Sequence, residues 1–130
     1  MKHIHFDTES DGFYGAYWEC RGGSECTVIA MLGDDPEDYM ARSAVKWLLR
    51  LDVNVLTMSP AKKDYSHHNY PLECIEKAIA WLKSHGSAKI GIAGASTTGT
   101  LALTAASIFD DISLTVAMTP SDFVWQGFMQ

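Results

Sequence analysis

The sequence predicts an α/β protein with a mainly parallel sheet and helices on both faces. Two observations lead to this fold class. Short, continuous apolar runs alternate with longer segments in which apolar residues recur three and four positions apart, and these are the patterns of buried strands and of amphipathic helices. Glycine or proline follows most of these segments. Regular alternation of strand and helix favours parallel strands joined by right-handed crossovers.

The elements expected in chain order are three strands followed by three helix-strand pairs. The first two strands, residues 2–8 and 13–20, have alternating aromatic character and are separated by Asp11-Gly12, so we expect a strand pair at an antiparallel sheet edge. The remaining elements are strands at 26–32, 53–58, 88–94 and 114–118 and helices at 39–51, 72–85 and 100–108. We expect one partial domain, residues 1–130, truncated after about the sixth strand.

The composition is that of a globular protein and argues against several classes of partner. Hydrophobic residues make up 47% of the chain, charged residues 20%, and the formal net charge is −6. Because the sequence contains no run of lysine and arginine, we expect it to bind neither nucleic acid nor anionic lipid. It offers no apolar stretch suited to a signal peptide or a membrane span, which predicts a cytoplasmic location.

Cysteine and acidic residues do not form a pattern typical of a metal site. Cys20, Cys26 and Cys74 are an odd number and are expected to be free thiols. The spacing of the first two differs from that of zinc ribbons. The acidic run 34–38 is explained by the favourable electrostatics of carboxylates at a helix start. We therefore expect neither a metal nor another cofactor.

The strongest candidate for chemistry is the turn at residues 94–99, where a predicted strand passes into a predicted helix. A serine held at such a corner exposes its hydroxyl, and the next backbone N–H points at the oxyanion that forms on a carbonyl substrate. Small residues must flank the serine because strand and helix cross closely. Gly94 and Ala95 meet this need, whereas the pattern G-x-S-x-G requires glycine where this sequence has Thr98, one position before Gly99.

A second interpretation of the same turn is structural. Ser96 or Thr97 could simply cap the helix that follows, as serine and threonine do at many helix starts. The position of the turn favours the catalytic interpretation. It follows the third parallel strand unit, and the loop after Gly33 could supply a second oxyanion donor.

Four stretches of the chain, residues 28–44, 53–58, 72–85 and 89–107, carry a resemblance to a known family. The sequence resembles the acyl-CoA thioester hydrolase and bile-acid-CoA:amino-acid N-acyltransferase C-terminal domain, in the dienelactone-hydrolase-like branch of the α/β-hydrolases. Residues 90–99 stand where that family has a glycine-bracketed nucleophile motif ending in two glycines. Thr98 replaces the first of these two glycines.

The resemblance implies a serine hydrolase that cleaves a small-molecule ester or acyl thioester through an acyl-enzyme. It implies that Ser96 is the nucleophile, that Thr97 gives one oxyanion N–H, and that the Gly33-Asp34 corner gives the other. Four residues complete the nucleophile elbow: Gly94, Ala95, Thr98 and Gly99. Serine favours hydrolysis, since family members with a cysteine nucleophile tend toward acyl transfer. An acyltransferase of the same fold and a noncatalytic binding domain are the alternatives.

The triad acid and base have no candidate in the family's order. That order places an Asp or Glu and then a His after the nucleophile, but all five histidines of this chain precede Ser96. A serine without a base is a weak nucleophile, so we expect the chain alone to be nearly inactive. We favour the explanation that the chain is a truncated product of a longer gene. The alternative is that His67 or His68 supplies the base, but these two residues are more simply interpreted as solvated loop histidines.

Two further expectations concern apolar surface. A sheet that stops after its sixth strand exposes an apolar edge, so we expect a homodimer through that edge, or aggregation. Trp47 and Trp81 lie at core spacing on predicted helices and are expected to pack inside the protein. Trp125, after the last strand, is the tryptophan expected at an acyl pocket.

Overall fold

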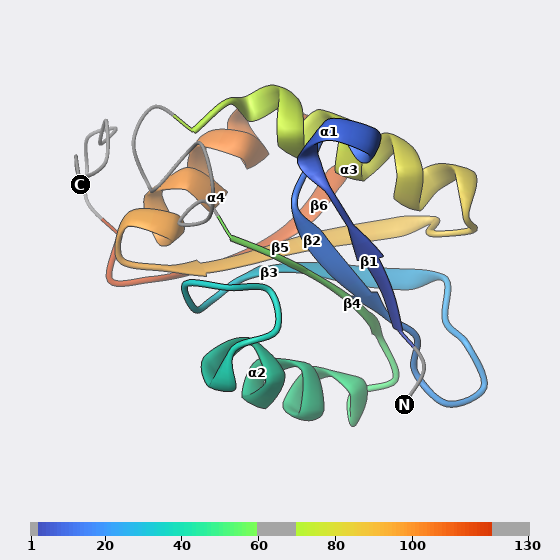
Figure 1. Cartoon of the computed structure of the whole chain (residues 1–130). Coiled ribbons are helices and arrows are strands. Elements are labelled where there is room, and N and C mark those ends of the chain that lie inside the picture. The colour runs from blue at the N-terminus through green and yellow to red at the C-terminus, as the bar shows by residue number, and fades with distance from the viewer. Residues whose placement is uncertain (1–2, 60–69, 121–130) are drawn as a thin grey trace.

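A computed structural model describes residues 3–59 and 70–120 of the chain. In this part six strands and four helices follow one another (Figure 1). Their bounds are β1 His3–Phe6, α1 Thr8–Asp11, β2 Gly15–Trp18, β3 Cys26–Met31, α2 Tyr39–Leu49, β4 Asn54–Met58, α3 Leu72–Ser84, β5 Lys89–Ala95, α4 Thr97–Ile108 and β6 Ile112–Met118.

The strands form one mixed sheet in the order β1-β2-β4-β3-β5-β6. β1 pairs with β2, and β2 with β4, in antiparallel register. The pairs β3–β4, β3–β5 and β5–β6 are parallel. The predicted α/β class, with a mainly parallel sheet and an antiparallel N-terminal edge, is confirmed.

Helices cover the sheet on both faces (Figure 1). On one face α3 and α4 enclose the larger core cluster, which includes Leu56, Ile75, Leu82 and Ile92. On the other face α2 lies over a smaller cluster around Trp18 and five further apolar or small residues, Ala16, Ala30, Val45, Val55 and Leu48. All five residues of β4 are buried, as expected of a central strand with helices on both sides.

The periodicity of α3 shows how sequence spacing produces this packing. Its buried residues are Cys74, Ile75, Ala78, Ile79 and Leu82, which recur three and four positions apart and so form one stripe along the helix. Full burial of one such Leu or Ile side chain contributes about 1.5–3 kcal/mol.

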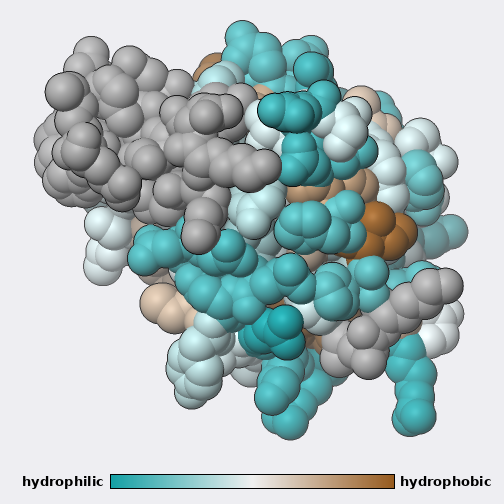
Figure 2. Space-filling view, in the orientation of Figure 1, coloured by the Kyte–Doolittle hydropathy of each residue, from teal (hydrophilic) through white to brown (hydrophobic). Residues whose placement is uncertain are grey.

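The side of the molecule seen in Figure 2 is mostly hydrophilic, with small apolar areas among the polar side chains.

The largest differences from the sequence-based expectation are an additional helix, α1, and the start of α4. A short helix, α1, stands between the first two strands where only a turn at Asp11-Gly12 was expected. It forms because the Asp7 carboxylate accepts a hydrogen bond from the N–H of Glu9, and it ends at Gly12 with φ 83°. Helix α4 begins at Thr97 instead of residue 100, so it starts directly after Ser96.

The prediction for Trp47 is wrong. Its relative exposure is 65%, because the part of α2 that faces the sheet is formed by Ala41 and Val45. Trp81 does pack against the larger core cluster, as expected. Among residues 3–59 and 70–120, no helix has the length and apolar character needed to cross a membrane.

Candidate active site

Ser96 occupies a strained corner between β5 and α4. Its backbone angles are φ 54° and ψ −120°, a combination that residues other than glycine rarely adopt and that costs on the order of 1–3 kcal/mol. Ser96 is exposed to solvent. Although Ser96 stands at the N-cap position, its side chain makes no cap hydrogen bond. Helix capping therefore does not explain the serine, which is exposed at the strained corner.

Close backbone contacts at the corner exclude a side chain at Gly94 and leave little room for one at Gly99. A Cβ at Gly94 would overlap the carbonyl oxygen of Thr98 and lie 2.5 Å from its carbonyl carbon. A Cβ at Gly99 would lie 3.0 Å from the carbonyl oxygen of Met118. Gly94 is thus required by the space available where strand and helix cross, and Gly99 leaves little room for a side chain there.

Thr98 replaces a glycine of the expected motif without opening the turn. Its hydroxyl oxygen accepts a hydrogen bond from the Ala95 N–H and donates one to the Ala95 carbonyl oxygen, each at 2.9 Å. The side chain is buried, with 6% relative exposure. The threonine therefore folds back under the turn, and the departure from G-x-S-x-G is accommodated by two new hydrogen bonds.

The sheet brings the Gly33-Asp34 corner to the same edge as Ser96. In the parallel pair β3–β5, Met31 lies opposite Gly94. Two residues further along each chain stand Gly33 and Ser96, where both strands have passed into loops at their carboxyl ends (Figure 1). The carboxyl edge of a parallel sheet is where ligands of α/β proteins bind.

The loop at residues 33–38, named here the β3–α2 loop, is folded around the Asp38 carboxylate. Asp38 Oδ2 accepts hydrogen bonds from the N–H groups of Asp34 at 2.7 Å and Asp35 at 3.1 Å, and Oδ1 accepts one from Ala41 at 2.8 Å. Gly33 has φ 91°, and a Cβ there would overlap Asp38 Oδ1. Burial acts to raise the pKa of the Asp38 carboxyl, but the surrounding backbone N–H groups outweigh it and leave that pKa below its ordinary value.

Hydroxyl groups at the end of β4 hold the other side of the β3–α2 loop. Ser59 Oγ donates to the Asp34 carbonyl oxygen at 2.7 Å, and Thr57 Oγ1 donates to the Pro36 carbonyl oxygen at 2.7 Å. Both hydroxyl-bearing residues are buried. The loop is therefore anchored through its carbonyl groups to the sheet and through its N–H groups to Asp38.

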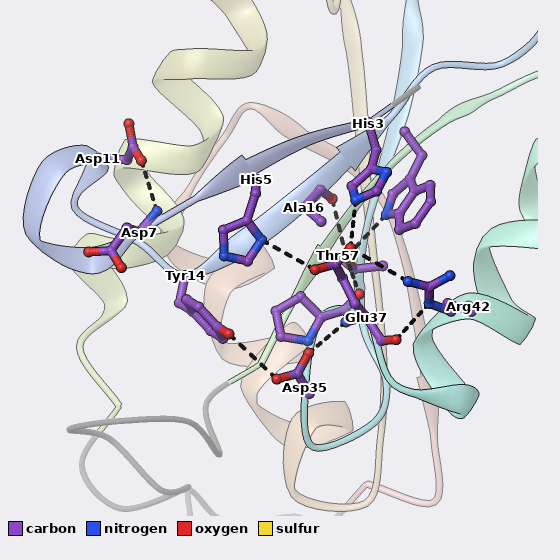
Figure 3. Close-up of polar contacts among 12 residues, drawn as sticks. His3, His5, Asp7, Asp11, Tyr14, Ala16, Asp35, Glu37, Arg42 and Thr57 are labelled. Atoms are coloured by element: carbon purple, nitrogen blue, oxygen red, sulfur yellow. Dashed lines mark hydrogen bonds and ion pairs between the residues drawn. The ribbon is translucent and has the colours of Figure 1, made fainter. Parts of the chain in front are cut away.

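Glu37 joins the same loop to the N-terminal edge of the sheet (Figure 3). Its carboxylate lies 2.6 Å from His3 Nε2, 3.5 Å from His5 Nδ1 and 3.7 Å from Arg42 Nη2. Arg42 Nε also donates to the Glu37 carbonyl oxygen at 2.8 Å. The imidazole of His3 stacks on Trp18, with ring centroids 4.1 Å apart. Two of the five histidines thus serve the loop and not the serine.

No histidine of the described residues hydrogen-bonds to Ser96. His3 and His5 contact Glu37. His85 ends α3, stacks on Trp81 and bonds the Trp81 carbonyl oxygen through Nδ1 at 2.8 Å. His85 lies before β5 in the chain and Ser96 directly after it, so the two residues stand at opposite ends of this strand. His67, His68 and Trp125, which the sequence raised as site candidates, lie outside the described residues.

Several residues in or around the β3–α2 loop were not predicted from the sequence as part of the site, namely Asp38, Glu37, His3, Thr57 and Ser59. The acidic residues before Tyr39 were interpreted only as favourable charges at a helix start. An Asp directly before the first helical residue is also the pattern of an N-cap, and this signal could have indicated Asp38. Nothing local in the sequence connects His3 or Ser59 to the loop, because sheet topology makes those contacts.

The fold and the serine corner define the class of protein. Among solved structures, the Pyrococcus furiosus esterase PF2001 is similar, with 24% identity and a TM-score of 0.71 over 92% of this chain and 49% of that one. Est1E from Butyrivibrio proteoclasticus has 19% identity and a TM-score of 0.69, over 92% of this chain and 51% of that one. The α/β-hydrolase GrgF from Penicillium sp. sh18 has 16% identity and a TM-score of 0.66, over 92% and 45%. The chain therefore has the α/β-hydrolase fold.

Residues 70–130 match the family described as BAAT / Acyl-CoA thioester hydrolase C terminal. The predicted resemblance to this domain and to the α/β-hydrolase superfamily is confirmed. The family match begins at residue 70, so the first half of the chain is placed by fold alone. No curated protein matches the chain. The chain spans about half the length of the three solved structures named above.

Proposed function

We propose that Ser96 is the nucleophile of a serine hydrolase that cleaves a small-molecule ester or acyl thioester. The observation that carries this proposal is the conformation of Ser96, at φ 54° and ψ −120° on an exposed strand-to-helix corner, with no cap hydrogen bond from its side chain. Strain of this kind persists only where the surrounding contacts enforce it and is concentrated at functional sites. Here Gly94, Thr98 and Gly99 enforce it.

In the proposed reaction Ser96 Oγ attacks the carbonyl carbon of the substrate while a base removes the hydroxyl proton. The carbonyl π electrons move to oxygen, and the Thr97 N–H, the first after the nucleophile, stabilises the oxyanion. Collapse of the tetrahedral intermediate expels the alcohol or thiol, which takes up a proton. Water then cleaves the acyl-enzyme in the same way and regenerates Ser96.

The base and its acid partner are proposed to lie outside these residues. No histidine follows Ser96 in the sequence, and the chain spans about half of the esterases that it resembles in fold. Loss of the base alone removes several orders of magnitude of rate. We therefore propose that the 130-residue chain on its own is nearly inactive, hydrolysing esters several orders of magnitude more slowly than the full-length gene product, which is the active form.

Labelling by a fluorophosphonate tests the nucleophile. The full-length gene product should form one covalent adduct, located by peptide mass spectrometry on Ser96 and absent in Ser96→Ala. Ser107→Ala is the matched control, because Ser107 is an exposed serine on α4 whose hydroxyl bonds the Thr104 carbonyl oxygen. No adduct on Ser96 in the folded protein would contradict the proposal and favour a noncatalytic binding domain. Capture of the acyl group by an added amino acid in place of water would assign the protein to acyl transfer.

A further inference from the structure

The Asp38 carboxylate binds one backbone N–H of the Gly33-Asp34 corner, the corner that was expected to supply the second oxyanion donor. The Asp34 N–H donates to Asp38 Oδ2 at 2.7 Å, the short distance of a charge-assisted hydrogen bond. A hydrogen bond weakens steeply when the N–H is not directed at its acceptor. In this conformation the Asp34 N–H is directed at Asp38, so it is not available to an oxyanion on a substrate attached to Ser96.

The two peptide groups on either side of Asp34 are held differently. The peptide between Asp34 and Asp35 is fixed at both ends, its carbonyl oxygen by Ser59 Oγ at 2.7 Å and its N–H by Asp38 Oδ2 at 3.1 Å. Between described residues, the peptide joining Gly33 and Asp34 has a short hydrogen bond at its N–H, whereas its carbonyl oxygen lies 3.5 Å from Ser59 Oγ. The Gly33–Asp34 peptide is thus the one that can turn.

Gly33 provides the freedom for such a rotation. Rotation of this peptide changes ψ of Gly33 and φ of Asp34. Gly33 stands at φ 91°, and because it has no Cβ it can adopt a wide range of ψ there at little cost. The rest of the β3–α2 loop is anchored independently, by Thr57 at the Pro36 carbonyl and by Arg42 at the Glu37 carbonyl. Loss of the bond to Asp38 would therefore free one peptide while the loop around it keeps its place.

We propose that Asp38 is a positioning residue that holds the Asp34 N–H away from the candidate oxyanion site, so that this N–H can act as an oxyanion donor only after its bond to Asp38 is released. This inference rests on the proposed function. Release of the Asp34 N–H would add a second donor to the Thr97 N–H, which directly follows the proposed nucleophile, and two such donors stabilise an oxyanion better than one.

Asp38→Ser separates this role from helix capping. Serine is as good an N-cap as aspartate, so its hydroxyl can still accept the Ala41 N–H that now bonds Asp38 Oδ1. Its single, uncharged oxygen cannot also hold Asp34 and Asp35. In the full-length gene product we expect kcat for ester hydrolysis to rise about five-fold with KM unchanged, because release of a charge-assisted bond no longer precedes each turnover. Asp7→Ser, at the cap of α1, is the matched control and should leave both constants unchanged.

Amide hydrogen exchange, read by NMR, tests the bond independently of activity. In Asp38→Ser the Asp34 amide should exchange faster while the Ala41 amide stays protected. Faster exchange together with a higher kcat supports the proposal. A kcat that is unchanged or lower overturns it, as does an Asp34 exchange rate equal to that of the unmodified protein. Failure of the unmodified protein to label at Ser96 would instead reject the proposed function, and the exchange data would still decide whether Asp38 holds the Asp34 N–H.

Discussion

The N–H of Ser96 donates to the carbonyl oxygen of Met118 at 2.8 Å, so the candidate nucleophile is tied to the last residue of β6. The same carbonyl oxygen is the atom that a Cβ on Gly99 would approach to 3.0 Å. The end of β6 therefore fixes the backbone of Ser96 and leaves little room for a side chain at position 99 of α4. The strained corner is a product of three elements, β5, α4 and β6, and not of the turn sequence alone.

Gly94→Ala should destabilise the protein because there is no space for a methyl group, although the backbone there is not in the left-handed region. The added Cβ would lie 2.5 Å from the Thr98 carbonyl carbon and 2.9 Å from the Gly99 nitrogen. We expect the free energy of unfolding to fall by about 3 kcal/mol, the upper part of the range for overpacking. Urea denaturation measures this. Gly91→Ala is the control, since its Cβ would meet nothing closer than 3.4 Å, and a loss of equal size there would contradict the explanation.

Thr98→Val should weaken the corner while keeping its shape. Valine has the same volume but leaves the Ala95 N–H and carbonyl without the two bonds that Thr98 makes at 2.9 Å. An unsatisfied buried polar group costs about 1–3 kcal/mol, so thermal unfolding should shift to lower temperature and phosphonate labelling of Ser96 should slow. Thr98→Ser keeps the hydroxyl and should behave more like the unmodified protein. Equal stability of the Val and Ser variants would show that these bonds do not support the turn.

The fold was largely predictable because most of its elements carry their own signal. Buried strands such as β4 are continuous apolar runs, and the buried stripe of α3 repeats at helical spacing. The corner at Ser96 was predictable for the same local reason, since small residues there mark a close crossing. The helical turn at α1 was missed because it depends on two side-chain hydrogen bonds, from the Glu9 N–H to the Asp7 carboxylate and from the Asp7 N–H to the Asp11 carboxylate. Trp47 was misplaced because helical spacing alone does not say which stripe of α2 faces the sheet.

The arrangement around the β3–α2 loop could not be predicted from the sequence. The residues that anchor it come from β1, from the end of β4 and from α2. The most distant pair along the chain, His3 and Glu37, is separated by 34 residues. Such contacts exist only after the sheet has ordered its strands. Local patterns identified Gly33 and Asp34 as a corner, and only the tertiary fold shows that the Asp34 N–H is already bonded to Asp38.

Asp38 should make folding stability depend on pH under acidic conditions. Burial acts to raise the pKa of its carboxyl, the N–H groups together lower it by more, and the pKa in the folded state is therefore below the ordinary value of 3.8, which applies to the unfolded chain. Between these two pKa values the unfolded state binds more protons, so the contribution of Asp38 is complete above the unfolded pKa and is lost as pH falls through the folded one. The stability difference between the unmodified protein and Asp38→Asn should therefore shrink below about pH 4. Urea titrations across that range would reject this origin if the difference stayed constant.

The β6 edge should make the isolated 130-residue chain self-associate. Within residues 3–59 and 70–120, β6 pairs with β5 only, and its side chains Leu114 and Val116 are 63% and 48% exposed. An unpaired strand edge with apolar side chains is a template for pairing with a second copy, and charged residues on such a strand prevent it. The double variant Leu114→Lys, Val116→Lys should therefore be monomeric where the unmodified chain dimerises or aggregates in light scattering. Ile4→Lys, on the opposite edge strand β1, is the control because Ile4 is also an exposed apolar residue, at 46%. If the unmodified chain stayed monomeric over a wide concentration range, β6 would not be a pairing edge; if Ile4→Lys alone abolished association, the interface would lie on β1.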